Sequence, residues 1–204
     1  MGVDGTLVEE GKSVLNPEYF DEIRRLKEKG IMFAVVSGRS YAASGPLFAP
    51  VTNDIIFIND NGASLTYQGK TIKAHTIPVE VVKEMIRDLS DEVKEVTYLS
   101  ALEGSYCWEK DKEFCRILKE DFHLNVTELE KMPDSLPDDA GIMSLGMYDP
   151  ADAEAAVGEE FITKWNQHEL IKAVPGGQYW FNVMQKNIDK GVALRELMEM
   201  YDFK

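Results

Sequence analysis

Three short segments carry the side chains best suited to chemistry in this sequence. Asp4-Gly5-Thr6 combines a carboxylate, a flexible residue and a hydroxyl. Ser37-Gly38-Arg39 follows an apolar run, so a serine oxygen and backbone N–H groups beside a glycine could converge on an anion. Lys190-Gly191 adds an ammonium group at the start of a predicted helix, where the macrodipole disfavours a cation. These residue types point to the binding of a small anion.

Each segment also has a plainer interpretation. Asp-Gly is a common pair in surface turns. Ser37 could simply cap a strand-to-helix turn, and Lys190 could be a solvated lysine beside Asp189. Taken one at a time, the three segments leave both interpretations open.

The elements around these segments predict an open α/β layer. Residues 16–30 have the apolar spacing of an amphipathic helix, and residues 31–36 form a continuous apolar run of strand length. A second such run, residues 55–58, ends at Asn59-Asp60-Asn61-Gly62. Strands that are apolar on both faces belong to parallel sheets covered by helices, and such sheets bind ligands beyond the carboxyl ends of their strands. We therefore expect the polar segments after both strands to line a site.

The middle of the chain has a different pattern of apolar and polar residues. Residues 63–76 alternate in the manner of a β-hairpin with a turn at Gln68-Gly69, and a helix is predicted from Pro78 to about Leu89. Residues 93–183 mix short strands with helices near 112–122 and 151–167. This mixture indicates an α+β lobe.

The end of the chain returns to a helix, predicted at residues 190–201. Four apolar side chains are expected to face inward from it: Val192, Leu194, Leu197 and Met198. The domain organisation expected from these patterns is a core made of residues 1–76 and 184–204, with an α+β domain of residues 77–183 inserted between them.

Composition and charge exclude several classes of protein. The 204 residues include 22 Lys plus Arg and 36 Asp plus Glu, which gives a net charge of −14 and makes nucleic acid or an anionic membrane surface an unfavourable partner. No stretch approaches the roughly 20 apolar residues of a spanning helix, and no targeting signal is recognisable. Two cysteines, Cys107 and Cys115, make no disulfide framework and have no partners at metal spacing. A cytoplasmic location is the default expectation.

The motifs together resemble one family. Asp-Gly-Thr-Leu near the start, an apolar strand ending in Ser-Gly-Arg, Asn-Gly-Ala after the next strand and a late Lys-Gly before a helix are similar to the haloacid dehalogenase superfamily, and within it to the Cof-type phosphatases with a large α/β cap. The resemblance implies a partial Rossmann-like core with a parallel sheet and an inserted α+β cap. It further implies a Mg²⁺-dependent phosphatase of small phosphorylated metabolites, such as a sugar phosphate.

The same resemblance assigns roles to individual residues. Asp4 takes the place of the general acid/base, and its backbone carbonyl takes that of a Mg²⁺ ligand. Ser37 takes the place of the phosphate-binding hydroxyl, and Lys190 that of the lysine that stabilises developing charge. Further positions match substrate-binding residues: Thr6, Gly38, Arg39, Asn61 and Gly62.

The chain departs from the family pattern at both ends. Gly2 stands where the nucleophilic aspartate belongs; in a shifted alignment Asp4 is the nucleophile and the acid/base is missing instead. Only Met1 remains of the expected first strand, and the fourth motif, whose carboxylates hold Mg²⁺ in the family, would lie beyond the end. We therefore expect weak Mg²⁺ binding, and whether this chain is itself an enzyme stays open.

Three interpretations of these departures are kept, in order of preference. The chain is an incomplete form of a normal phosphatase; or it is a non-catalytic relative that binds a ligand or partner; or a second copy supplies the missing strands in a strand-swapped homodimer. The first is preferred because Ser37, Asn61 and Lys190 would otherwise have little reason to occur together.

Overall fold

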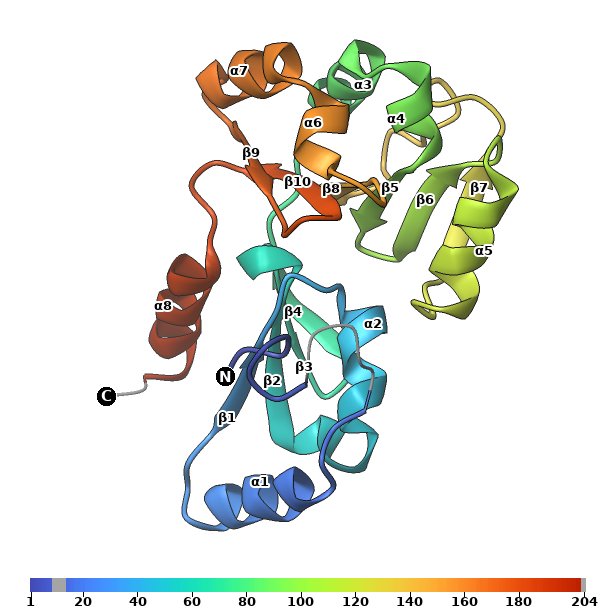
Figure 1. Cartoon of the computed structure of the whole chain (residues 1–204). Helices are drawn as coiled ribbons and strands as arrows, with labels where there is room; N and C mark the ends of the chain where they lie inside the picture. The colour runs from blue at the N-terminus through green and yellow to red at the C-terminus, as the bar shows by residue number, and fades with distance from the viewer. Residues whose placement is uncertain (9–13, 203–204) are drawn as a thin grey trace. The chain divides into compact units, whose positions relative to one another are not determined.

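The structure is a computed structural model that describes residues 1–8 and 14–202 (Figure 1). It divides into two compact units. The first contains Met1–Ala74 and Ile188–Lys204, and the second contains His75–Asn187. The predicted core ranges include residues 9–13, 203 and 204, which lie outside the described residues.

The first unit is built on a four-stranded sheet in the order β1-β2-β3-β4. Strands β1 (Phe33–Val36) and β2 (Ile55–Asn59) are parallel, as the two continuous apolar runs predict. Strands β3 (Ser64–Tyr67) and β4 (Lys70–Ala74) continue the sheet antiparallel and form the predicted hairpin. Its turn residues, Gln68 and Gly69, both have positive φ, which suits a tight two-residue hairpin turn.

Helices cover both faces of this sheet. Alternate side chains of β2 enter two different apolar clusters, which explains why the whole strand is buried. On one face Ile55 and Phe57 lie in the cluster of α1 (Glu18–Glu28). On the other face Ile56 and Ile58 contact α8 (Lys190–Tyr201). The α/β prediction is therefore confirmed.

Short helical segments complete the first unit. Between β1 and β2 lie α2 (Tyr41–Ser44) and the 3-10 segment η1 (Gly45–Asp54). A second 3-10 segment, η2 (Asp60–Gly62), follows β2 directly. Two of the candidate segments, 37–39 and 59–62, thus lie at the carboxyl ends of two neighbouring parallel strands.

The predicted inward face of α8 is partly wrong. Ala193 and Leu197 are the side chains buried against the sheet, whereas Leu194 and Met198 are exposed. Successive residues of a helix are about 100° apart around its axis. When residues 193 and 197 face the sheet, residues 194 and 198 therefore lie on the flank of the helix. An apolar residue on either side of the true stripe gives the same sequence pattern.

The second unit is built on a six-stranded sheet in the order β7-β6-β5-β8-β10-β9. Neighbouring strands are antiparallel except β6 and β7. The bounds are β5 (Thr97–Ala101), β6 (Gly104–Trp108), β7 (Val126–Leu129), β8 (Ile142–Tyr148), β9 (Ile171–Pro175) and β10 (Trp180–Gln185). This unit has the α+β character that the mixed pattern predicts.

Five helices belong to this unit: α3 (Val79–Asp88), α4 (Asp91–Glu95), α5 (Lys112–Glu120), α6 (Ala153–Val157) and α7 (Glu159–Gln167). The apolar side chains of α3 and α7 pack on β5, β8, β9 and β10 in one cluster. The single helix predicted at 151–167 is in fact two, because Gly158 has φ +89° and ends α6 before α7 begins. None of the described helices is both long and apolar enough to cross a bilayer.

Candidate functional site

The serine loop after β1 continues the strand pairing to its last residue. Ser37 is buried, and its backbone N–H donates to the carbonyl of Ile58 in the neighbouring strand at 2.9 Å. Its Oγ accepts the backbone N–H of Arg39 at 3.0 Å. Because Oγ accepts here, the hydroxyl keeps its own hydrogen for donation to a bound anion.

The loop after β2 is tied to the serine loop by three hydrogen bonds. Asn61 donates its backbone N–H to the carbonyl of Ser37 at 3.1 Å. The carbonyl of Arg39 accepts both the backbone N–H of Asp60 and the side-chain Nδ2 of Asn59, each at 3.0 Å. The two loops therefore form one rigid edge at the carboxyl ends of β1 and β2, where α/β sheets bind ligands.

Gly38 lies where these two loops approach each other closely. A Cβ atom at this position would lie 3.0 Å from Oδ1 of Asn61. The Asn61 side chain consequently lies directly over the glycine of the Ser-Gly-Arg segment.

Helix α8 begins against the same edge. Gly62 has φ +106°, and a Cβ atom there would lie 2.6 Å from the carbonyl carbon of Asp189 and 3.2 Å from the backbone nitrogen of Lys190. Asp189 caps the helix by accepting the backbone N–H of Val192 at 2.8 Å. Lys190, the first residue of α8, is thereby placed beside the Asn61-Gly62 loop, and among the described residues no carboxylate pairs with its exposed ammonium group.

Asp4 is brought to this edge by an arginine. The guanidinium of Arg39 donates to both carboxylate oxygens of Asp4, with Nε at 3.1 Å from Oδ2 and Nη2 at 2.5 Å from Oδ1. Asp4 itself lies in a turn anchored by the buried side chains of Val3, Leu7 and Val8. A two-point contact of this kind fixes the orientation of the carboxylate as well as its position.

The first residues also extend the sheet beyond β1. Gly2 forms a parallel bridge with Val36, whose N–H donates to the carbonyl of Met1 at 2.8 Å. A Cβ atom at Gly2 would lie 3.2 Å from Oγ1 of Thr6. Position 2 and Thr6 therefore share one small space near the end of β1.

The structure thus gathers the predicted residues in one region of the first unit. Contacts run from Asp4 through Arg39 to the serine loop, then through Asn61-Gly62 to the start of α8. Thr6 lies beside Gly2, and Gly2 pairs with Val36 at the end of β1. The roles given to these residues stay predictions.

The described donor set does not fit a Mg²⁺ ion. Mg²⁺ requires near-octahedral oxygen coordination, usually with one or two carboxylates. Arg39 engages both oxygens of Asp4, and nowhere in residues 1–8 and 14–202 do three His, Cys, Asp or Glu side chains converge as metal ligands would. No step of the chemistry below is therefore derived through a metal.

One residue of the edge was missed by sequence reasoning. Asn59, the last residue of β2, is fully buried, and its Nδ2 donates to the Arg39 carbonyl and to Oγ of Ser44 at 2.8 Å. Its Oδ1 is buried without a partner, and so is Oγ of Ser40. A polar residue at the end of a wholly apolar strand was the signal that could have found it.

Comparison with known proteins gives consistent matches. A family model described as haloacid dehalogenase-like hydrolase matches residues 1–204. The chain is 29% identical over 70 residues to the 5-amino-6-(5-phospho-D-ribitylamino)uracil phosphatase YbjI of Escherichia coli K12, a match that covers 34% of this chain and 26% of that protein. It is 23% identical over 212 residues to a Haemophilus influenzae protein named only provisionally as a phosphatase, covering 99% of this chain and 73% of the relative.

The fold has close structural counterparts. The crystal structure of a protein from Eubacterium rectale superposes with a TM-score of 0.83 at 25% identity, covering 98% of this chain and 75% of that chain. The matches therefore extend over both units of the chain.

Proposed function

The chain belongs to the haloacid dehalogenase-like hydrolases, and from that premise we propose that it acts on phosphate monoesters of small metabolites such as sugar phosphates. The E. coli relative supports this substrate class, since its name describes a phosphatase of a phosphorylated ribityl compound. The low shared coverage leaves the particular substrate open, so the proposal is confined to the class.

One observation carries the proposal: the serine loop, the Asn61-Gly62 loop and the start of α8 meet at one edge. A phosphate here would be offered the Ser37 hydroxyl and the ammonium group of Lys190. The backbone N–H groups of the first helical turn lack partners within the helix and add further donors. Donors fixed in advance around the transferring phosphoryl group stabilise charge at no cost of reorganisation during the reaction.

Asp4 is the residue proposed to handle the proton or to attack phosphorus. Arg39 holds the carboxylate in one orientation. If Asp4 is the acid/base, Gly2 stands at the position of the nucleophile, and the space beside Thr6 admits a Cβ after a shift of a few tenths of an ångström. Gly2→Asp should then raise turnover. If Asp4 is the nucleophile, Gly2→Asp leaves turnover unchanged, and Asp4→Asn abolishes it in both cases.

The role of Mg²⁺ is part of the proposal and is tested separately. Phosphotransferases of this superfamily are generally metal-dependent, whereas the described residues supply too few ligands. We therefore expect added Mg²⁺ to leave turnover of a generic phosphate ester unchanged with these residues alone. Turnover should rise with Mg²⁺ when further carboxylates are supplied.

The decisive experiment compares two lysines of the first unit. Binding of inorganic phosphate is measured by calorimetry for the wild type, for Lys190→Ala and for Lys70→Ala, the control being an exposed lysine of β4. Loss of one charged hydrogen bond costs roughly 1.5–3 kcal/mol, so Lys190→Ala should weaken phosphate at least about tenfold. Lys70→Ala should leave the affinity unchanged. Equal effects, or no phosphate binding by the wild type, would refute the anion site.

A second function is favoured by one observation. Gly2 offers no nucleophile and Arg39 occupies both oxygens of Asp4, so a non-catalytic protein that binds a phosphorylated ligand is the alternative. Phosphate binding that depends on Lys190, without turnover by the wild type or by Gly2→Asp, would support it. Gel filtration of the same sample tests the strand-swapped homodimer, which should elute at twice the mass of the chain.

A further inference from the structure

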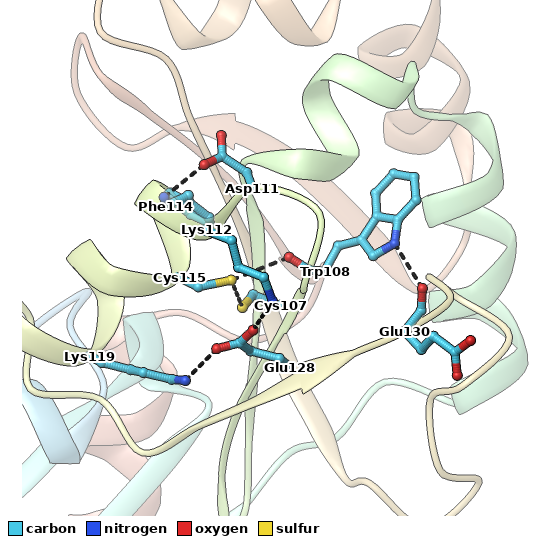
Figure 2. A network of polar contacts seen from close by, with 9 residues as sticks. All are labelled: Cys107, Trp108, Asp111, Lys112, Phe114, Cys115, Lys119, Glu128 and Glu130. Atoms are coloured by element: carbon cyan, nitrogen blue, oxygen red, sulfur yellow. Dashed lines mark hydrogen bonds and ion pairs between the residues drawn. The ribbon is translucent and has the colours of Figure 1, made fainter.

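Two cysteines lie in contact in the second unit, away from the candidate site in the sequence. The sulfur atoms of Cys107 and Cys115 are 2.9 Å apart, and both residues are free thiols and buried (Figure 2). A disulfide bond is about 2.05 Å long, so the two sulfurs need to approach by less than about 1 Å to bond. The chain has no other cysteine.

Regular structure holds both thiols in place. Cys107 lies on β6, which pairs with β5 and β7, and Cys115 lies in the first turn of α5. Asp111 caps that helix by accepting the backbone N–H of Phe114 at 2.9 Å. Because Phe114 and Leu118 are also buried, α5 cannot easily move away from the sheet. The proximity of the thiols is therefore built into the fold of this unit.

We propose that Cys107 and Cys115 form a dithiol oxidation site whose oxidant is a peroxide. The Cys115 thiolate attacks one oxygen of hydrogen peroxide, the O–O bond breaks, and hydroxide leaves to take up a proton. The resulting sulfenic acid is attacked by the sulfur of Cys107, an S–S bond forms, the S–O bond breaks, and water departs. In sum two thiols lose two electrons and two protons, and one peroxide becomes two waters.

The order of the two thiols follows from their surroundings. Cys115 can donate its S–H to the carbonyl of Trp108 at 3.3 Å, which leaves the S–H of Cys107 to donate to the Cys115 sulfur, and this second hydrogen bond favours the Cys115 thiolate. Burial raises the pKa of both thiols, and the contact with Cys115 raises that of Cys107 further while it lowers that of Cys115. Cys115 is thus the better source of thiolate and Cys107 the resolving thiol.

The charged groups nearby come from two elements. Glu128 on β7 disfavours both thiolates, Lys112 on α5 favours that of Cys115, and Lys119 on α5 favours both. The three side chains lie beside the thiols (Figure 2). Both lysines are bonded to Glu128, so their effects partly cancel. Desolvation therefore dominates, and oxidation should be slow at neutral pH and accelerate about tenfold per pH unit while the thiol stays mostly protonated.

Oxidation would fasten α5 to β6. The disulfide would close a loop of about nine residues, and the chain-entropy relation for such a loop predicts a rise in the midpoint of thermal unfolding of roughly 5–10 °C for a chain of this size. The structural change is local, because the sulfurs already touch.

The test uses the full chain and hydrogen peroxide at pH 7.0, 8.0 and 9.0. Intact mass should fall by about 2 Da, thiol alkylation after unfolding should be blocked, and dithiothreitol should restore both. Wild-type protein whose thiols stay open to alkylation, or that forms only disulfide-linked dimers, would overturn the proposal. So would a mass gain that stops at sulfinic acid.

Two single variants test the order of attack. In Cys107→Ser the sulfenic acid at Cys115 has no resolving partner and should be trapped by dimedone, while Cys115→Ser should show much slower labelling of Cys107. The reverse pattern would refute Cys115 as the attacking thiol. Should either variant fail to fold, the mass and alkylation results on the wild type still decide whether the pair forms a disulfide.

Discussion

Gly62→Ala is the sharpest test of how the candidate site is assembled. The added methyl group would lie 2.6 Å from the carbonyl carbon of Asp189 and 3.2 Å from the nitrogen of Lys190. Both are backbone atoms, so relief requires the first turn of α8 to move away from the loop after β2. Lys190 would move with it.

The magnitude can be worked from two contributions. An alanine at positive φ costs about 1–2 kcal/mol, and forcing an extra methyl into a packed contact costs about 1–3 kcal/mol more. We expect a loss of about 3 kcal/mol in the free energy of unfolding. Gly69→Ala is the matched control, because Gly69 also has positive φ but a Cβ there would meet nothing within 4 Å. It should cost only about 1 kcal/mol.

The assay is urea unfolding of both variants, followed by calorimetry with inorganic phosphate under conditions in which each is folded. Gly62→Ala should lose stability by about 2 kcal/mol more than Gly69→Ala, in keeping with overpacking, and should also bind phosphate more weakly. Gly69→Ala should bind as the wild type does. Equal stabilities would show that α8 does not press on Gly62. Unchanged phosphate affinity of folded Gly62→Ala would show that the start of α8 takes no part in the site.

Two further outcomes are expected. Asn59→Ala removes buried donors from the Arg39 carbonyl and Ser44, so urea unfolding should show a loss of about 2 kcal/mol; a loss below about 0.5 kcal/mol would contradict its positioning role. Hydrogen bonds from Lys112 and then Lys119 lower the pKa of the Glu128 carboxyl below its ordinary value of 4.5, so its contribution to stability is complete above that pH and is lost as the pH falls through the folded pKa. Thermal unfolding from pH 6 to pH 3 should therefore show a smaller acid-induced loss in Glu128→Gln than in the wild type, and parallel curves would contradict this.

The parts of the fold that could be predicted are those where one physical rule acts alone. The runs at 31–36 and 55–58 are apolar at every position, which is typical of strands in a sheet covered on both faces, and β1 and β2 are indeed parallel, although β1 begins only at Phe33. The Gln68-Gly69 turn was equally determined, since a two-residue hairpin needs positive φ. The buried face of α8 could not be predicted, because apolar residues lie on both sides of the buried stripe formed by Ala193 and Leu197. The break at Gly158 was not determined either, because a single glycine within a helical pattern is compatible with a continuous helix as well as with a helix end, and only its φ of +89° shows which one forms.

In the candidate site, too, some residues could be found from the sequence and others could not. Ser37, Asn61 and Lys190 follow recognisable strand and helix boundaries, so their types and order could be found in the sequence. Asn59 carries one sequence signal, a polar residue at the end of an apolar strand, but its partners Arg39 and Ser44 could not be inferred because they lie across the strand connection. Contacts between backbone carbonyls and distant side chains leave no periodic signal.

Arg39 offers less positive charge to an anion than its place in the sequence suggests, because it is paired with Asp4. The family resemblance implies that Arg39 binds substrate, but its guanidinium lies on Asp4, and the pair is only partly exposed. A phosphate arriving at the edge therefore meets an arginine whose charge is already balanced by a carboxylate. On a chain of net charge −14, attraction of an anion to the proposed site would then depend chiefly on Lys190 and on the N–H groups of α8. If phosphate displaced Arg39 from Asp4, it would gain a second cation but would leave a carboxylate nearby, and the repulsion would offset much of that gain. Arg39 therefore holds the Asp4 carboxylate in place, and Lys190 is the residue that we propose to recognise phosphate.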